Sequence, residues 1–137
     1  MRKLKKLLAV ASVAAMTLSL CACGGKKDDT YTVGICQLVQ HEALDAATKG
    51  FKDALVEEFG EDGIKFDEQN AQGDANTCAT IINGFVSSDV DLILANATPA
   101  LQAAAAGTDT IPILGTSVTE YGVALEIQDF NGTVGRN

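Results

Sequence analysis

Residues 31–44, which read YTVGICQLVQHEAL, contain the pattern that decides the fold. The apolar run at residues 33–36 has the length of a strand, polar side chains follow at Gln37, Gln40 and His41, and a helical pattern begins near Ala43. A strand that is apolar on both faces belongs in a sheet covered on both sides, and such sheets are usually parallel with helical crossovers. Ligands bind outside the carboxyl ends of parallel strands, so residues 37–42 are the first place to look for a binding site.

The same alternation of strand and helix patterns continues along the chain. A helix is predicted over residues 43–59 with Gly60 as its C-terminal cap, and Asp74 is the predicted N-cap of the next helix. Thr98 is the predicted N-cap of a third helix that starts at Pro99. Further strands are expected at residues 63–70, 90–95, 111–115 and 123–127. This pattern predicts an α/β fold with a doubly wound parallel sheet in the order 2-1-3-4-5.

The first 30 residues have the composition of an export signal followed by a tether. Residues 1–22 begin with basic side chains, continue with an apolar run and end in small residues, which predicts a lipoprotein signal peptide. Cys23 is then the cysteine that carries lipid, and residues 23–30 form a flexible polar tether. The expected location is the cell membrane, with the chain lipid-anchored on the extracytoplasmic face. An ordinary signal peptide and an uncleaved anchor are the alternatives.

The length and the net charge of the chain limit the number of domains and the kinds of partner that it can have. The chain has 137 residues, so residues 31–137 are interpreted as one domain. Four of the ten basic residues lie in the first six positions, which leaves six basic side chains against 18 acidic ones after signal removal. Nucleic acid is therefore not an expected partner, because phosphate binding needs a basic face. Cys36 and Cys78 are interpreted as buried free thiols in preference to a disulfide.

Three loops are predicted to meet at the carboxyl edge of the sheet, at residues 37–42, 96–99 and 116–120. They offer amide, imidazole and hydroxyl groups together with the start of a helix. That set suits hydrogen bonding of a small polar or zwitterionic solute, whose carboxylate would face the positive helix end. The candidate ligand-binding residues are Gln37, His41, Glu42, Asn96, Thr98, Ser117 and Thr119.

The same loops do not form an evident catalytic centre. His41 is the only histidine, and Cys36, which is near it in sequence, ends a buried strand. No GxGxxG or GxxxxGK[ST] motif occurs, so no nucleotide cofactor, and no other cofactor or metal, is predicted. The chain is therefore not expected to be an enzyme. A secreted α/β enzyme, which would have to use His41, Glu42 or Glu120, and an extracellular ligand-sensing lipoprotein stay open as alternatives.

Five blocks of sequence resemble one protein family in order. They are VGICQLVQHEALDAATKGFKDAL (33–55), QNAQGD (69–74), VDLILANATPALQAAA (90–105), IPILGTSVTEYGVAL (111–125) and NGTVGRN (131–137). Together they resemble the first lobe of the ABC transporter substrate-binding lipoproteins of the tryptophan/tyrosine-binding type. Proteins of that family have the type I periplasmic-binding-protein fold, in which two doubly wound lobes close on a ligand.

The resemblance implies a function and partners. It implies an extracytoplasmic component of an ABC importer that binds a small solute, an amino acid of aromatic type, and delivers it to a membrane permease with a cytoplasmic ATPase. It also implies that residues 31–137 form the N-terminal lobe and that the second lobe is absent from this chain. The identity of the solute stays open, because the one aromatic side chain in the loops, Tyr121, could stack on a ring or pack internally.

Overall fold

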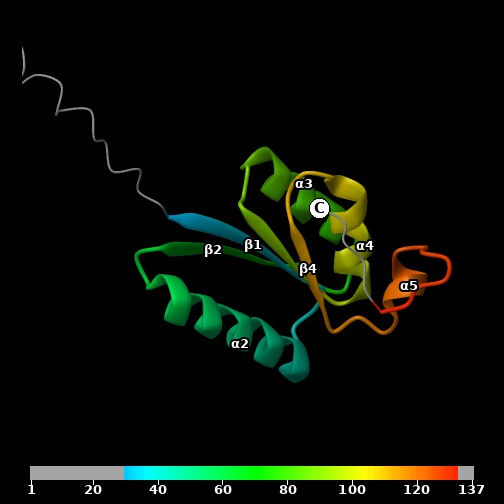
Figure 1. Ribbon diagram of the computed structural model, residues 1–137, viewed down its shortest axis with the longest axis horizontal. Coiled ribbons are helices and arrows are strands. Elements are labelled where there is room, and N and C mark those ends of the chain that lie inside the picture. Colours follow the sequence, from blue (N-terminus) through cyan, green and yellow to red (C-terminus); the bar gives the residue numbers. More distant parts are fainter. Residues whose placement is uncertain (1–29, 133–137) are drawn as a thin grey trace, which may run out of the picture.

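Strands and helices alternate along residues 30–132, the part of the chain that the computed structural model describes. The elements are β1 (Tyr31–Gln37), α2 (Glu42–Phe59), β2 (Ile64–Asn70), α3 (Ala75–Ser87), β3 (Leu92–Asn96), α4 (Thr98–Gly107), β4 (Ile113–Thr116) and α5 (Tyr121–Ala124). The strands form one parallel sheet in the order β2-β1-β3-β4 (Figure 1). The predicted α/β class and the order 2-1-3-4 are confirmed. The predicted signal peptide, Cys23 and residues 24–29 lie outside the described residues.

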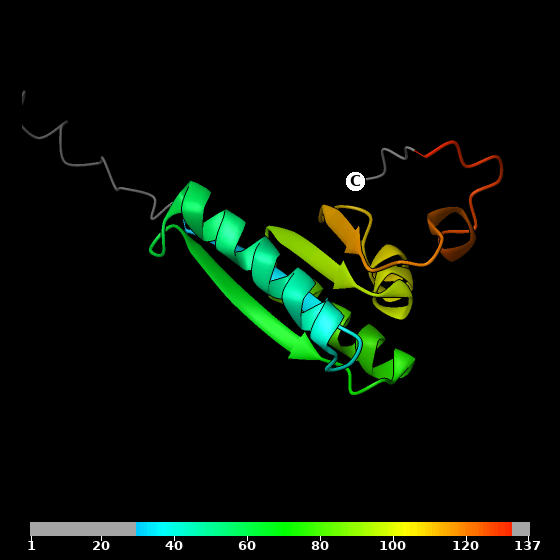
Figure 2. The same cartoon turned by 90° about the horizontal axis from the view of Figure 1, so that it is seen from below.

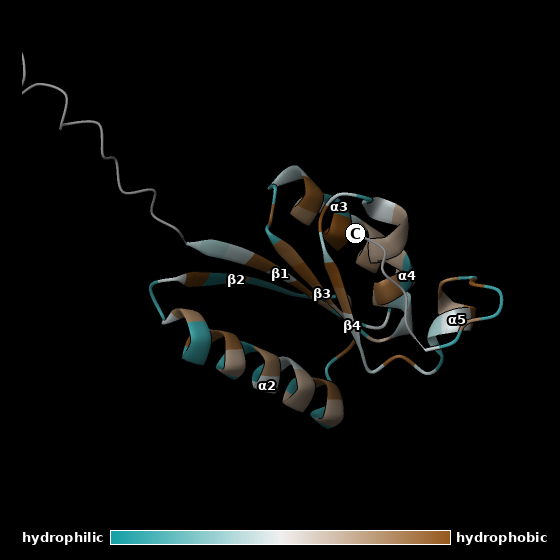
Figure 3. Cartoon of the chain, in the orientation of Figure 1, coloured by the Kyte–Doolittle hydropathy of each residue, from teal (hydrophilic) through white to brown (hydrophobic). Residues whose placement is uncertain are grey.

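Helices cover the sheet on both faces. Helix α2 lies on one face and α3 and α4 lie on the other (Figure 2). Figure 3 shows hydrophobic residues on the central strands and on α3. Successive residues of β1 pack on opposite faces of the sheet. Ile35 belongs to the hydrophobic cluster beneath α2, and Cys36 belongs to the cluster beneath α3. Both side chains are fully buried, as expected for a strand that is apolar on both faces.

The ends of two helices follow the predicted signals. The side chain of Asp74 caps α3 by accepting a hydrogen bond from the backbone N–H of Thr77 at 2.6 Å. This hydrogen bond is the main cause that lowers the pKa of Asp74. Gly60 ends α2 with a φ of 76°, a conformation that suits glycine.

The predicted N-cap of α4 is wrong by one residue. Thr98 is the first residue of the helix, and Ala97 is the N-cap, with a φ of 97° and no side-chain cap hydrogen bond. The physical reason is strand pairing: the N–H of Ala97 donates to the carbonyl of Thr116 at 2.9 Å, so the chain stays in the sheet through Asn96 and turns sharply at Ala97.

The predicted fifth strand at residues 123–127 is also wrong. Residues 121–124 form the short helix α5 instead. The carboxylate of Glu120 accepts hydrogen bonds from the N–H groups of Gly122 (2.9 Å) and Val123 (2.5 Å). The N–H of Leu125 then donates to the carbonyl of Tyr121 at 3.0 Å. These local hydrogen bonds stabilise a helical turn. A strand at residues 123–127 could form only if they were broken.

The two cysteines of the described chain are free and fully buried, as predicted. Cys36 lies on β1 and Cys78 on α3, and the two thiols influence each other's pKa in the core. Burial raises the pKa of Cys36 to about 12, so this thiol stays protonated and unreactive at neutral pH. Within residues 30–132, every helix is too short or too polar to cross a lipid bilayer.

Candidate functional site

The three predicted loops do meet at the carboxyl edge of the sheet, and hydrogen bonds join them. We call this edge, made of residues 37–42, 96–99 and 116–120, the rim. The N–H of Leu38 donates to the carbonyl of Asn96 at 3.2 Å, and Ala97 is bonded to Thr116 as described above. The N–H of Thr119 donates to the hydroxyl of Thr98 at 3.4 Å. The rim is therefore a connected surface that three neighbouring chain segments could present to one ligand.

The candidate ligand residues divide into two groups by exposure. His41, Glu42, Ser117 and Thr119 are exposed and Thr98 is half-buried, so their side chains are accessible at the rim. His41 is also the N-cap of α2, where its Nδ1 accepts a hydrogen bond from the N–H of Ala43 at 3.2 Å. The ligand roles of these five residues stay predictions.

Gln37 and Asn96, the other two candidates, are buried beneath the rim. Their side chains are 5% and 0% exposed, and both hydrogen-bond to Thr48 of α2, which is 2% exposed. The hydroxyl of Thr48 donates to Oε1 of Gln37 at 2.7 Å, and Nδ2 of Asn96 donates to the hydroxyl of Thr48 at 2.9 Å. Nε2 of Gln37 donates to the carboxylate of Asp45 at 2.6 Å. We call these four residues the rim network.

Sequence reasoning missed Thr48 and Asp45. Thr48 lies four residues after Leu44 and three before Phe51, on the apolar stripe that faces the sheet. A hydroxyl on this stripe, opposite the polar ends of two strands, was the available signal. Asp45 follows His41 by one helical turn and gave no signal in the sequence beyond its place in the first turn of α2.

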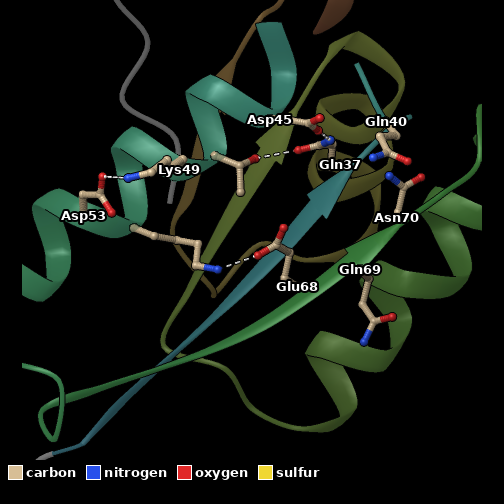
Figure 4. A pocket seen from close by; sticks show the side chains of 10 residues that line it. Gln37, Gln40, Asp45, Lys49, Asp53, Glu68, Gln69 and Asn70 are labelled. Atoms are coloured by element: carbon tan, nitrogen blue, oxygen red, sulfur yellow. Dashed lines mark hydrogen bonds and ion pairs between the residues drawn. The ribbon is translucent and has the colours of Figure 1, made fainter. Parts of the chain in front are cut away.

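A polar cleft of about 680 Å³ opens beside the rim network, between α2 and β2 (Figure 4). The ammonium group of Lys52 on α2 reaches the carboxylate of Glu68 on β2 at 2.7 Å, across the cleft. Lys49 pairs with Asp53 along α2. Because the lysines and two of the acidic groups are paired with each other, the cleft presents little unbalanced charge.

A second hollow of about 330 Å³ lies beside β4 and is more apolar, with Leu101, Tyr121, Leu125 and Phe130 among its walls. The hydroxyl of Tyr121 donates to the carbonyl of Gly115 at 2.9 Å. Tyr121 therefore packs against the end of β4, the second of the two roles considered for it.

The rim can bind and orient a ligand, but its groups are not arranged for covalent chemistry. Nδ1 of His41 is engaged as a helix cap, and the thiol of Cys36 points into the core with its pKa raised to about 12. The start of α4 offers backbone N–H groups that the N-cap Ala97 does not satisfy with a side chain. A helix start of this kind stabilises an anionic group such as a carboxylate. No cluster of three metal-binding side chains occurs within residues 30–132.

Comparison with known proteins identifies related chains. Residues 32–134 match the family described as ABC transporter substrate binding protein. A tyrosine-binding protein of Clostridioides difficile is 46% identical over 107 residues, which cover 74% of this chain and 31% of that protein. A ligand-free, open substrate-binding protein with adhesive properties from Clostridium difficile superposes with a TM-score of 0.66 at 45% identity, covering 69% of this chain and 33% of that one.

A third relative was crystallised with a ligand. It is an ABC domain from Streptococcus pneumoniae in complex with L-Trp, with a TM-score of 0.66 and 34% identity over 69% of this chain and 32% of that chain. The chain thus spans about a third of the length of these relatives. Two of these relatives are described as a tyrosine-binding protein and a substrate-binding protein. The match over residues 32–134 places this chain in the ABC transporter substrate-binding protein family.

Proposed function

We propose that the chain is the solute-binding component of an ABC importer and that its rim binds an amino acid without changing it chemically. The observation that carries the proposal is the rim itself, where three loops joined by hydrogen bonds bring exposed hydroxyl, imidazole and carboxylate side chains to the edge of the sheet at which α4 starts. The positive end of α4 suits the carboxylate of a zwitterion. The carboxylate of Glu42 suits an ammonium group.

The relatives support an aromatic amino acid as the solute. One is named for tyrosine and another was crystallised with L-Trp, at 46% and 34% identity to this chain. The apolar hollow beside β4 lies along the edge of the sheet, and its walls are packed side chains. It is therefore a poorer candidate than the rim for binding the aromatic ring of the solute. We therefore place the solute at the rim, with its ring directed away from the core.

The proposed partners follow from the family and from the N-terminal sequence. A lipid on Cys23 would hold the domain at the extracytoplasmic face of the cell membrane, with residues 23–30 as a tether. The solute would pass from the domain to a membrane permease driven by a cytoplasmic ATPase. No chemical step by the domain is required, and we propose none.

The test is an NMR titration of isotope-labelled residues 24–137 with single L-amino acids. We expect L-tyrosine and L-tryptophan to shift backbone signals of the rim at millimolar concentration, and signals of α3 to stay unchanged. Weak affinity is expected because one rim leaves most of the ligand surface in water, whereas solute sites usually enclose it. Shifts that are absent, or that lie only along the sheet edges, would contradict the proposal. Turnover of the added compound would favour the enzyme alternative.

A further inference from the structure

We propose that Gln37, Thr48 and Asn96 are positioning residues, which hold the first rim loop and the start of α2 in place for the solute. This inference rests on the proposed function only where its test measures the affinity for an amino acid. It also differs from the expectation that Gln37 and Asn96 touch the ligand themselves. The observations behind it are a change in the chemistry of one packing layer and the hydrogen bonds made there.

The layer between the sheet and α2 changes from apolar to polar as it approaches the rim. On β1 the residues that face α2 are Val33, Ile35 and then Gln37, and on β3 their paired neighbours are Leu92, Leu94 and then Asn96. Both strands therefore replace an aliphatic side chain by an amide at the same level. A buried amide costs free energy unless it is hydrogen-bonded, so apolar residues would have extended the core more simply.

The polar residues of this layer bind one another and the backbone of the first rim loop. Nδ2 of Asn96 donates to the carbonyl of Leu44, in the first turn of α2, at 2.9 Å. Nε2 of Gln37 donates to the carbonyl of Val39, within the loop, at 3.0 Å. Thr48 joins the two amides, as described above. The network thus holds the loop on both sides of His41 and Glu42, the two exposed candidates that the loop carries.

Burial argues against direct contact with the solute. Asn96 is fully buried, and its Oδ1, which has no hydrogen-bond partner among the described residues, is enclosed by protein. The amide of Gln37 is 5% exposed, and its atoms already bond to Asp45, Thr48 and Val39. In Figure 4 the side chain of Gln37 points toward Asp45, on the wall of the cleft. These residues therefore act through the loop that they hold.

The experiment compares Thr48→Val with Thr48→Ser in residues 24–137. Valine keeps the shape of threonine but loses the hydroxyl, whereas serine keeps the hydroxyl. The readout is hydrogen exchange at the amides of Leu38, which donates to Asn96, and Asp45, which donates to the carbonyl of His41. We expect Thr48→Val to speed exchange at both amides about tenfold relative to the Cys78 amide of α3. We expect Thr48→Ser to behave like the unchanged chain.

The matched control is Ile82→Val, which removes one buried methylene from α3 outside the rim network. It should lower the melting temperature without selective exchange at Leu38 and Asp45. In the amino-acid titration, Thr48→Val should weaken binding severalfold, and Thr48→Ser and Ile82→Val should not. If Thr48→Val does not fold, Asp45→Ala replaces it, because Asp45 is exposed. Asp45→Ala should also speed hydrogen exchange at the Leu38 amide, but by a smaller factor.

Two outcomes separate this inference from the proposed function. If Thr48→Val and Ile82→Val give the same exchange pattern, Thr48 is only a packing residue and the inference is wrong. If the unchanged chain binds no amino acid, the proposed function fails, while exchange at Leu38 and Asp45 still decides whether the rim network positions the loop.

Discussion

Three of the six non-glycine residues with positive φ in the described part of the chain follow the ends of strands. Gln72, Ala97 and Ser117, which follow β2, β3 and β4, have φ angles of 55°, 97° and 55°. Positive φ costs a residue other than glycine about 1 to 3 kcal/mol and persists only where surrounding contacts maintain it. At Ala97 that contact is the hydrogen bond to Thr116. Ala97 and Ser117 lie in the rim, so this part of the chain contains backbone strain.

The thiol of Cys36 gives a residue-scale prediction for stability against pH. Burial, the largest cause, and the neighbouring Cys78 raise its pKa from 9.0 to about 12. A raised pKa in the folded state means that the unfolded chain loses the proton first. The stabilisation is therefore complete below pH 9 and is lost as the pH rises toward 12. The loss approaches about 1.4 kcal/mol per pH unit above pH 9.

Urea unfolding between pH 8 and pH 10.5 measures this slope. The control is Cys36→Ala, which removes the titrating group, and the quantity compared is the pH slope of the free energy of unfolding. We expect a steeper fall for the unchanged chain. Equal slopes would show that the Cys36 thiol ionises in the folded state as easily as in the unfolded one.

At the scale of elements, the contact of β1 with α3 depends on a glycine. A Cβ atom at Gly34 would lie 2.6 Å from Cδ2 of Phe85, a side chain that is 1% exposed. Gly34→Ala should therefore destabilise the lobe by about 1 to 3 kcal/mol, because the ring must shift in a packed core. Chemical denaturation measures the change.

Two further variants test the cause of that destabilisation. Gly50→Ala in α2 is the matched control, because its added Cβ would meet nothing within 4 Å apart from its chain neighbours and the backbone of its own helix. It should stabilise the helix by about 0.5 to 1 kcal/mol. In the double variant Gly34→Ala with Phe85→Leu, the two losses should be less than additive. Strict additivity would mean that the ring of Phe85 is not what Gly34 accommodates.

At the scale of the whole molecule, the sheet is covered unevenly. Helix α2 packs on β2, β1 and β3, and Leu114 of β4 is 49% exposed. The part of this chain that matches the relatives covers about a third of their length. If the rim binds the proposed solute, its affinity should be lower than that of a site that encloses its ligand.

The predicted membrane anchor also belongs to the scale of the whole molecule. If Cys23 carries lipid, protein extracted from membranes should have Cys23 as its first residue, with a lipid-sized increase in the mass of its N-terminal peptide. Cys23→Ser should leave the signal uncleaved and the cysteine unmodified. Cys21→Ser is the control, because that residue leaves with the signal, and its anchoring should be normal. A mature N-terminus elsewhere would rule out the lipoprotein prediction.

The sequence by itself determined the alternation of strands and helices, the parallel order 2-1-3-4, the caps at Asp74 and Gly60, and the loops that make the rim. Periodicity and capping are local signals, so they can be read along the chain. Only the tertiary structure decided that Ala97 caps α4 and that Gln37 and Asn96 are buried with Thr48. The hydrogen bonds of the rim network join residues up to 59 positions apart. Such partners are set by how α2 packs on the sheet, which no local pattern records.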